Sequence, residues 1–192
     1  AHVDTLGAMV RQIKPSGRLE LTSVGGFAWG SIEGENCLVH TRSNGTVRGS
    51  LLPHEASVHV YENVRDGKRD NLSMEVRLDE RVMTAEETRQ LGIEVGDFVS
   101  FDARVEIVNG FVKSRHLDDK ACVANIMAVF KALHDANLKP AVDTCFLISN
   151  FEEVGHGGSS DFPEGLDALG LRFVHPDAVH PLLTRLARGG RI

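Results

Sequence analysis

Short apolar stretches separated by turn residues dominate the sequence from about residue 6 to residue 114. The stretches GAMVRQI, RLELTSV, NCLVHT and EVRLDE have the length and composition of β-strands, and glycine, asparagine or proline separates them. Asn109-Gly110, between ARVEIV and FVKS, predicts a tight hairpin, because both central residues of a type I′ turn need a positive φ. GIEVGDFVSFD predicts a turn followed by a strand. This part of the chain is therefore predicted to be a β-rich module.

One short helix is expected inside this module, in the stretch TAEETRQLG. Thr84 and Glu87 have the spacing of a capping box, in which each side chain binds the other residue's backbone N–H. Gly92 ends the stretch, as glycine often does after a helix.

The pattern of apolar positions changes after residue 114. Between Asp119 and Asp135 the apolar residues recur at helical spacing, at Val123, Ile126, Met127, Phe130 and Leu133. After the break at NLKP, the run AVDTCFLISN is apolar and β-branched, which predicts a buried parallel strand. A helix, a break and a buried strand together favour an α/β layer.

The fold expected from these patterns is an α/β layer with an inserted small β-rich domain. Residues 1–12 and 114–165 are predicted to form the α/β layer, and residues 13–113 a β-barrel-like insertion. Residues 166–192 form an atypical tail rich in arginine, and both ends of the sequence look like the edges of a fragment.

Composition excludes several classes of protein. With 192 residues, 42 % of them hydrophobic and 25 % charged, the chain is expected to fold as one large domain or as one domain with an insertion. The net charge of −6 argues against a nucleic-acid-binding surface. No apolar run approaches the roughly 20 residues that a membrane span needs. Three widely spaced cysteines give neither a disulfide framework nor a CxxC zinc site, so we expect a cytoplasmic protein.

Three pairs of residues could contribute to a reaction. In AHVDTLG, His2 and Asp4 would face the same side of a strand, so that Asp4 could orient the imidazole of a metal-bound histidine. In SRHLDDKA, Asp119 is explained by capping of the following helix, whereas Asp118 is less easily explained in this way and could bridge two cations.

The third pair, Glu152 and Glu153, lies in SNFEEVGHGGSS, after the predicted buried strand. Open α/β sheets build their sites at the carboxyl ends of strands. One carboxylate could bind a metal while the other takes a proton from a metal-bound water, and the alternative is a solvated acidic turn. His156 is interpreted as a residue of the glycine-rich loop.

The order HxD, then DD before a helix, then EE after a strand resembles the M42 metallo-aminopeptidases, which include glutamyl and deblocking aminopeptidases. The motifs RHLDDKA and FEEVGHGG are the most specific part of this resemblance, which runs from Ala1 to about Pro163. It implies that His2, Asp118 and Glu153 are metal ligands, with Asp118 bridging two metals. Asp119 would be an outer-shell or capping residue.

The resemblance also implies a mechanism and a partner. Glu152 would act as general base and acid and Asp4 would orient His2, while two divalent ions (zinc, cobalt or manganese) activate a water that attacks the first peptide bond. The substrates would be peptides. The inserted module resembles the family's small β domain, which serves in assembly of a homo-oligomer and in access to the site.

The sequence departs from the family's pattern after Pro163. The family supplies two further ligands, an Asp and a His, and here Asp177, His175 and His180 stand in a context that matches neither. We therefore interpret the tail as out of frame. Two alternatives stay open: a catalytically incompetent chain that acts only through its oligomerisation module, and a glucanase-type glycosidase that uses Glu152 and Asp118 as its paired carboxylates.

Overall fold

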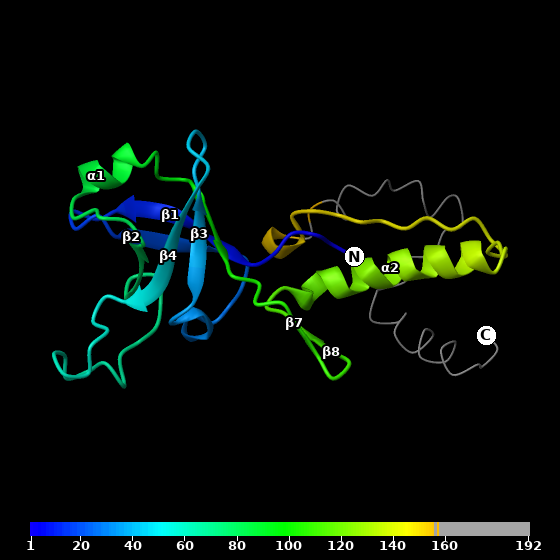
Figure 1. Cartoon of the computed structure of the whole chain (residues 1–192), viewed down its shortest axis with the longest axis horizontal. Coiled ribbons are helices and arrows are strands. Elements are labelled where there is room, and N and C mark those ends of the chain that lie inside the picture. Colours follow the sequence, from blue (N-terminus) through cyan, green and yellow to red (C-terminus); the bar gives the residue numbers. More distant parts are fainter. Residues whose placement is uncertain (156, 158–192) are drawn as a thin grey trace. The chain divides into compact units, whose positions relative to one another are not determined.

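The computed structural model describes residues 1–155 and 157, and the chain divides into two compact units (Figure 1). One unit consists of Thr5–His116. The other consists of Ala1–Asp4 together with the chain from Leu117 onward. Residues 7–13 form a strand that pairs within the first unit.

The first unit is built on a closed antiparallel barrel of six strands in the order β1-β2-β5-β4-β3-β6. The β-rich character of this module is therefore confirmed. The strand β4, which the sequence patterns did not single out, pairs with both β3 and β5. The strands of the barrel are β1 (Gly7–Ile13), β2 (Leu19–Val24), β3 (Asn36–His40), β4 (Thr46–Pro53), β5 (Met74–Leu78) and β6 (Phe98–Phe101).

Alternation of side chains along the strands fills the barrel. In β4 every second residue from Val47 to Pro53 is buried, while the residues between them are partly or fully exposed. Such alternation is expected where successive side chains point to opposite faces of a sheet. A single-turn 3₁₀ helix, η1 (Trp29–Ile32), adds the buried Ile32. The residues with no exposed surface at the centre of the core are Leu19, Leu21, Cys37, Val39, Leu51, Val76 and Ile93.

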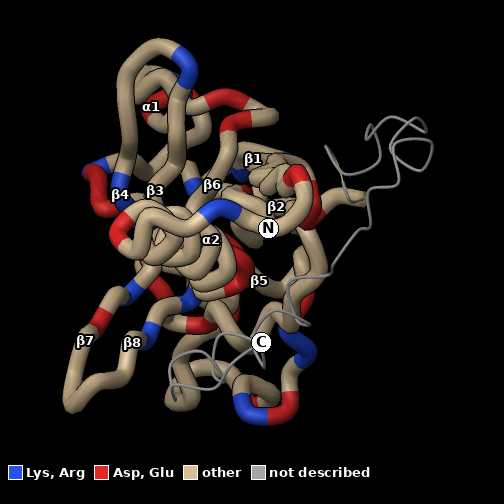
Figure 2. The backbone as a smooth tube through the Cα atoms, turned by 90° about the vertical axis from the view of Figure 1, so that its right-hand side faces the viewer, with Lys and Arg blue, Asp and Glu red and all other residues tan. Residues whose placement is uncertain are grey.

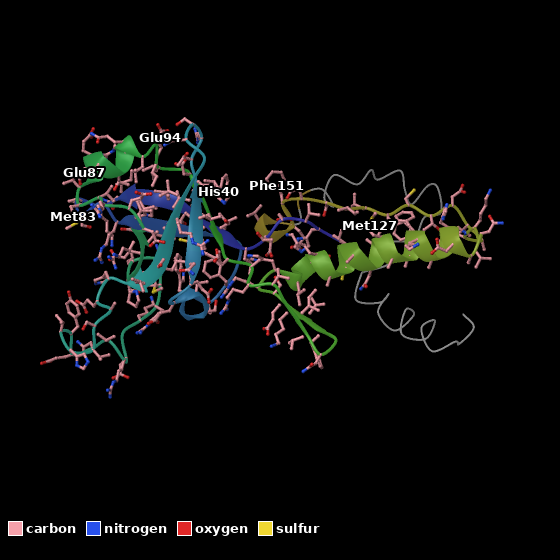
Figure 3. The ribbon with its side chains drawn as sticks, in the orientation of Figure 1. His40, Met83, Glu87, Glu94, Met127 and Phe151 are labelled. Carbon is pink, nitrogen blue, oxygen red and sulfur yellow. The ribbon has the colours of Figure 1, made fainter. Side chains whose placement is uncertain are left out.

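The expected short helix is present as α1 (Ala85–Gln90). The Oγ1 of Thr84 accepts a hydrogen bond from the N–H of Glu87, and the carboxylate of Glu87 accepts from the N–H of Thr84 at 3.0 Å. Glu87 and the neighbouring Met83 are labelled in Figure 3. Gly92 has a φ of +84°, the left-handed conformation that glycine adopts without strain. The capping box and the glycine stop are thus both confirmed.

The expected hairpin is present as β7 (Glu106–Val108) and β8 (Phe111–Lys113). Asn109 and Gly110 both have positive φ, 50° and 81°, as the turn type requires. Glu106 pairs with Lys113 across the two strands, and their charged groups are 3.3 Å apart. Figure 2 shows acidic and basic segments interspersed along the chain.

The second unit contains the helix α2 (Leu117–Asp135), which confirms the predicted helix. Asp118 and Asp119, joined by a cis peptide bond, have non-helical backbone angles, so the regular helix begins after them. Val123, Ile126 and Leu133 are half-buried, as the spacing predicted. Met127, labelled in Figure 3, and Phe130 are more exposed, although the Phe130 ring contacts the Phe146 ring with centroids 4.5 Å apart.

The prediction of a buried regular strand over residues 141–150 is wrong for the structure described. The segment is mostly exposed, and its one bridge is a parallel pairing of Ser149 with His2. A parallel strand becomes regular and buried when neighbours pair with both edges and helices cover both faces. Within residues 1–155, this segment forms a short ladder with residues 1–3, and its Phe146 ring contacts Phe130 of α2.

Among the described residues, none of the helices has the length and apolar character that crossing a membrane requires.

Candidate metal centre

Three segments that are far apart in the sequence meet within the second unit (Figure 1). They are the extended N-terminal residues, the start of α2 and the single-turn helix η2 (Glu152–Val154). Each segment contributes one of the pairs that the sequence singled out. The residues brought together in this way are His2, Asp4, Asp118, Asp119, Glu152 and Glu153.

Backbone hydrogen bonds fix the position of His2. The N–H of Ser149 donates to the carbonyl of Ala1 at 2.9 Å, and the N–H of Val3 donates to the carbonyl of Ser149 at 3.0 Å. These two bonds flank His2 in the pattern of a parallel ladder. His2 is consequently buried, with only 6 % of its surface exposed.

Both ring nitrogens of His2 face carboxylates. Nδ1 lies 3.2 Å from Oδ1 of Asp4, while Nε2 lies 3.2 Å from Oδ1 of Asp118 and 3.7 Å from Oε2 of Glu152. Asp4 also connects the other segments, because its Oδ2 accepts a hydrogen bond from the N–H of Glu153 at 3.1 Å. A carboxylate on one nitrogen fixes the ring's orientation and leaves the other nitrogen available to a metal.

The surrounding charges shift the acid–base behaviour of this cluster. Burial disfavours the charged form of His2, but the hydrogen bond with Asp118 and the charges of Asp4 and Glu152 outweigh burial, so the pKa of His2 is raised. Burial likewise disfavours the charged form of Asp4, yet hydrogen bonds from the backbone N–H groups of Glu153 and Glu152 lower its pKa. The pKa of Glu153 is raised by burial and by the negative charge of Asp118.

The Glu152-Glu153 pair follows a sharp turn. Phe151 has φ 63° and ψ 22°, left-handed angles that are uncommon for a residue other than glycine. The turn leads directly into η2, in which Glu152 and Glu153 are both half-buried. The N–H of Glu153 then reaches Asp4. The backbone conformation at Phe151 therefore helps to place the two glutamates against the N-terminal segment.

Asp119 and Lys120 contact the N-terminal segment through its backbone. Oδ2 of Asp119 accepts a hydrogen bond from the N–H of His2 at 3.2 Å, and Nζ of Lys120 donates to the carbonyl of Val3 at 2.7 Å. The sequence patterns did not single out Lys120. The only signal for it was its place in the motif LDDKA, immediately after the two aspartates.

The donor set fits a divalent cation in its chemistry. The carboxylates of Asp4, Asp118 and Glu152 face the imidazole of His2, and this concentration of negative charge is favourable when a cation is bound. Within residues 1–155 and 157, no three of the potential ligands lie close enough together to form a complete metal-binding group. His156, His175, Asp177 and His180 lie outside the described residues, as does most of the tail from residue 166.

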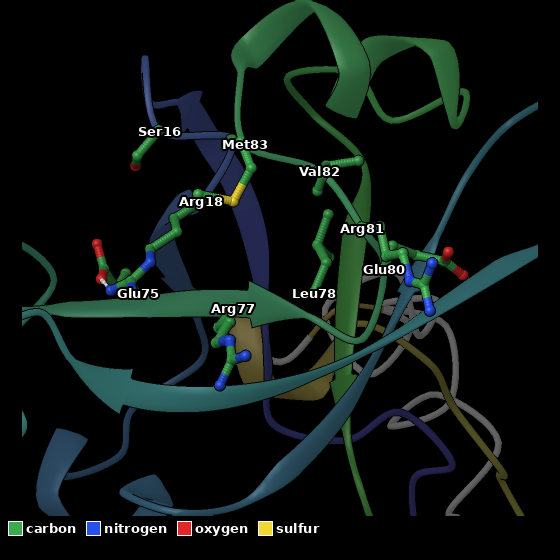
Figure 4. A pocket seen from close by; sticks show the side chains of 10 residues that line it. Ser16, Arg18, Glu75, Arg77, Leu78, Glu80, Arg81, Val82 and Met83 are labelled. Carbon is green, nitrogen blue, oxygen red and sulfur yellow. Dashed lines mark hydrogen bonds and ion pairs between the residues drawn. The ribbon is translucent and has the colours of Figure 1, made fainter.

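A separate cavity lies on the barrel unit (Figure 4). It has a volume of about 630 Å³ and is lined by none of the six residues of the cluster. Arg18 and Lys14 form ion pairs at its edge with the buried carboxylate of Glu75. Its lining therefore contains none of the residues that the sequence singled out as candidate ligands or bases.

A family model and a curated relative both place this chain among aminopeptidases. The family model of the M42 glutamyl aminopeptidases matches residues 1–169. The protein named "Putative aminopeptidase YhfE" from Bacillus subtilis (strain 168) is 51 % identical over 164 residues, which are 85 % of this chain and 47 % of that protein. The chain thus spans about half the length of this relative.

Solved structures show a similar fold at lower identity. The TET1 peptidase of Pyrococcus horikoshii, described as assembling into a tetrahedron or a large octahedral shell, matches 81 % of this chain and 45 % of its own with a TM-score of 0.62 and 24 % identity. The dodecamer PhTET1-12s matches 72 % of this chain and 39 % of its own with a TM-score of 0.57 and 24 % identity. From the match over residues 1–169 and the identity with YhfE, the chain belongs to the M42 glutamyl aminopeptidase family.

Proposed function

We propose that this chain contains part of the active site of a metal-dependent aminopeptidase, which removes N-terminal residues from peptides. The observation that supports this function most directly is that the carboxylates of Asp118 and Glu152 both face Nε2 of His2. These three residues come from segments that lie more than 30 residues apart in the sequence. Family membership supports the same reaction class.

The proposed roles follow from the positions of the side chains. His2, Asp118 and Glu153 would hold the metal ions, with Asp118 between two of them. Its side chain is 87 % exposed, which leaves its oxygens accessible to ions from solution. Asp4, held by the N–H of Glu153, would keep Nδ1 of His2 engaged, so that Nε2 is the nitrogen presented to a metal.

Two divalent ions of zinc, cobalt or manganese, when bound, would supply Lewis acidity toward a water and a peptide carbonyl. Glu152 is the proposed base, because its carboxylate lies 3.7 Å from Nε2 of His2, the nitrogen that would face the metal. It would accept a proton from the attacking water and return it to the departing amine. The half-buried position of Glu152 limits competing hydrogen bonds from bulk water.

We further propose that α2 and residues 141–150 belong to an α/β layer, with the barrel as an assembly and access domain. The parallel bridge between His2 and Ser149 supports such a layer, because parallel pairing is typical of α/β sheets. The TET peptidases of similar fold are described as a dodecamer and as large shells, which supports a homo-oligomer for this protein as well.

The test uses the purified 192-residue chain, equilibrated with zinc, cobalt or manganese and assayed for hydrolysis of aminoacyl anilides. We expect metal binding, and turnover that EDTA abolishes. Glu152→Gln should retain the metal but lose activity by about a hundredfold or more, since a positioned general base contributes roughly 10²–10⁴. Glu62→Gln, in an exposed barrel loop, is the matched control.

Other results would identify the alternatives. An assembled, folded chain that shows no turnover with any metal would favour a protein acting only through its oligomerisation module. Hydrolysis of a β-glucan that persists in EDTA would favour the glycosidase. Either result would overturn the aminopeptidase proposal for this chain.

A further inference from the structure

We propose that Lys120 is a positioning residue of the candidate metal centre, acting together with Asp119 by fixing the backbone of His2 and Val3. This inference rests on the proposed function, because it assigns the metal-binding role to His2. It goes beyond that function because it assigns a role to Lys120, whose ammonium group cannot itself bind a divalent cation.

The contacts that support it are two hydrogen bonds to consecutive residues of the N-terminal segment. Nζ of Lys120 donates to the carbonyl of Val3 at 2.7 Å, and Oδ2 of Asp119 accepts from the N–H of His2 at 3.2 Å. Lys120 and Val3 are separated by 117 positions in the sequence. The start of α2 therefore holds the N-terminal segment through its main chain.

These contacts complement those made by Ser149. The carbonyl of Ala1 and the N–H of Val3 are occupied by Ser149, which leaves the N–H of His2 on the opposite edge of the extended segment. The carboxylate of Asp119 accepts a hydrogen bond from that N–H. The main chain around His2 is thus held from both edges, and this fixes the position of its Cβ independently of the side-chain contacts.

A fixed backbone matters because Asp4 and Asp118 restrict only the ring. Asp4 determines which way the imidazole is turned, and Asp118 lies on its far nitrogen. If the backbone of residues 2 and 3 moved, the ring would move with it and would lose its contacts with both Asp4 and Asp118. A charge-assisted hydrogen bond, such as that from Lys120, is shorter and stronger than a neutral one and suits this purpose.

Neighbouring groups on the same helix separate this role from that of an ordinary surface lysine. Both Lys120 and Lys131 lie on α2 and are exposed, but Nζ of Lys131 pairs with Asp135, one turn away on the same helix. It connects no distant segment. Lys131→Met is therefore a matched control for Lys120→Met, with the same change in side chain and net charge.

The experiment measures the full chain in two ways. Amide hydrogen exchange of His2, Val3 and Ser149 is recorded by NMR without metal, and the zinc dissociation constant is measured by competition with a chromophoric chelator. Lys120→Met is expected to speed exchange at these amides by about tenfold and to weaken zinc binding by about 10- to 100-fold, the usual effect of losing an outer-shell contact. Lys120→Arg should restore both, and Lys131→Met should change neither.

The outcomes distinguish this inference from the proposed function. If the wild-type chain binds no zinc, the proposed function fails, while the exchange rates still decide whether Lys120 holds the segment. If the wild type binds zinc and Lys120→Met matches it in both measurements, the inference is overturned. It is also overturned if Lys120→Met speeds exchange equally throughout α2 and the barrel, since that result marks a general loss of stability.

Discussion

The ion pairs of Glu75 give the sharpest test of what stabilises the barrel. Glu75 lies on β5 and is only 3 % exposed, and its two carboxylate oxygens contact Arg18 and Lys14 separately, the latter at 2.9 Å. Burial alone would raise the pKa of Glu75, but the hydrogen bonds and charges of Lys14 and Arg18 outweigh burial and lower it. The charged form is therefore the one that the fold stabilises.

The magnitude expected for Glu75→Gln lies between two limits. Removing one partner of a fully buried ion pair costs about 3–5 kcal/mol, while an exposed pair contributes roughly 0–1 kcal/mol. The side chains of Lys14 and Arg18 are 22 % and 42 % exposed, so water partly solvates both cations once the carboxylate is lost. We expect the free energy of unfolding to fall by about 1–3 kcal/mol at pH 7.

The assay is urea denaturation of the wild type and of Glu75→Gln between pH 7 and pH 3. Because the folded-state pKa of Glu75 is below its unfolded value, the stabilisation is fully present above the ordinary glutamate pKa of about 4.3 and is lost as the pH falls through the folded-state pKa. The difference between the two proteins should therefore be constant from pH 7 to about pH 5 and shrink below about pH 4.3.

Glu80→Gln is the control, since Glu80 is exposed and lies on the same cavity edge. It should change the free energy of unfolding by no more than about 0.5 kcal/mol. The reasoning is refuted if Glu75→Gln unfolds at the same urea concentration as the wild type at pH 7. A difference that persists unchanged at pH 3 would equally refute it, because the effect would then not come from the carboxylate charge.

Three further predictions concern the barrel unit. Thr84→Ala should destabilise it by about 1 kcal/mol through loss of the capping box, measured by urea denaturation, whereas Thr84→Ser should be nearly neutral. Leu51→Ala, at a fully buried position, should cost about 2–5 kcal/mol in the same assay, while Leu72→Ala, at an exposed one, should stay within about 0.5 kcal/mol. Burial raises the pKa of the Cys37 thiol to about 12. A disulfide reagent at pH 8 should therefore label the exposed Cys145 quickly and Cys37 only after denaturation. Equal labelling rates for the two thiols would contradict the buried position of Cys37.

Local features of this protein could be predicted from the sequence, because the residues that determine them are neighbours in the chain. Asn109 and Gly110 specify their hairpin through the φ angles they tolerate, and Thr84 with Glu87 specifies the start of α1 through hydrogen bonds across one turn. The helix from residue 119 to 135 follows from apolar spacing in the same way. The chemical character of the candidate site was also visible in the sequence, as one pair of an imidazole with a carboxylate and two pairs of carboxylates.

The tertiary structure decided what depends on distant partners. Residues 141–150 have the composition of a buried strand, but their conformation depends on neighbours on both edges, and in the described chain residues 1–3 alone pair with them. No local pattern indicates that β5 pairs with β2 and β4, or that Lys120 reaches the carbonyl of Val3. The type of a side chain determines which bonds it can form. Its partner depends on how the whole chain folds, as with Lys120 and Val3, which are 117 positions apart in the sequence.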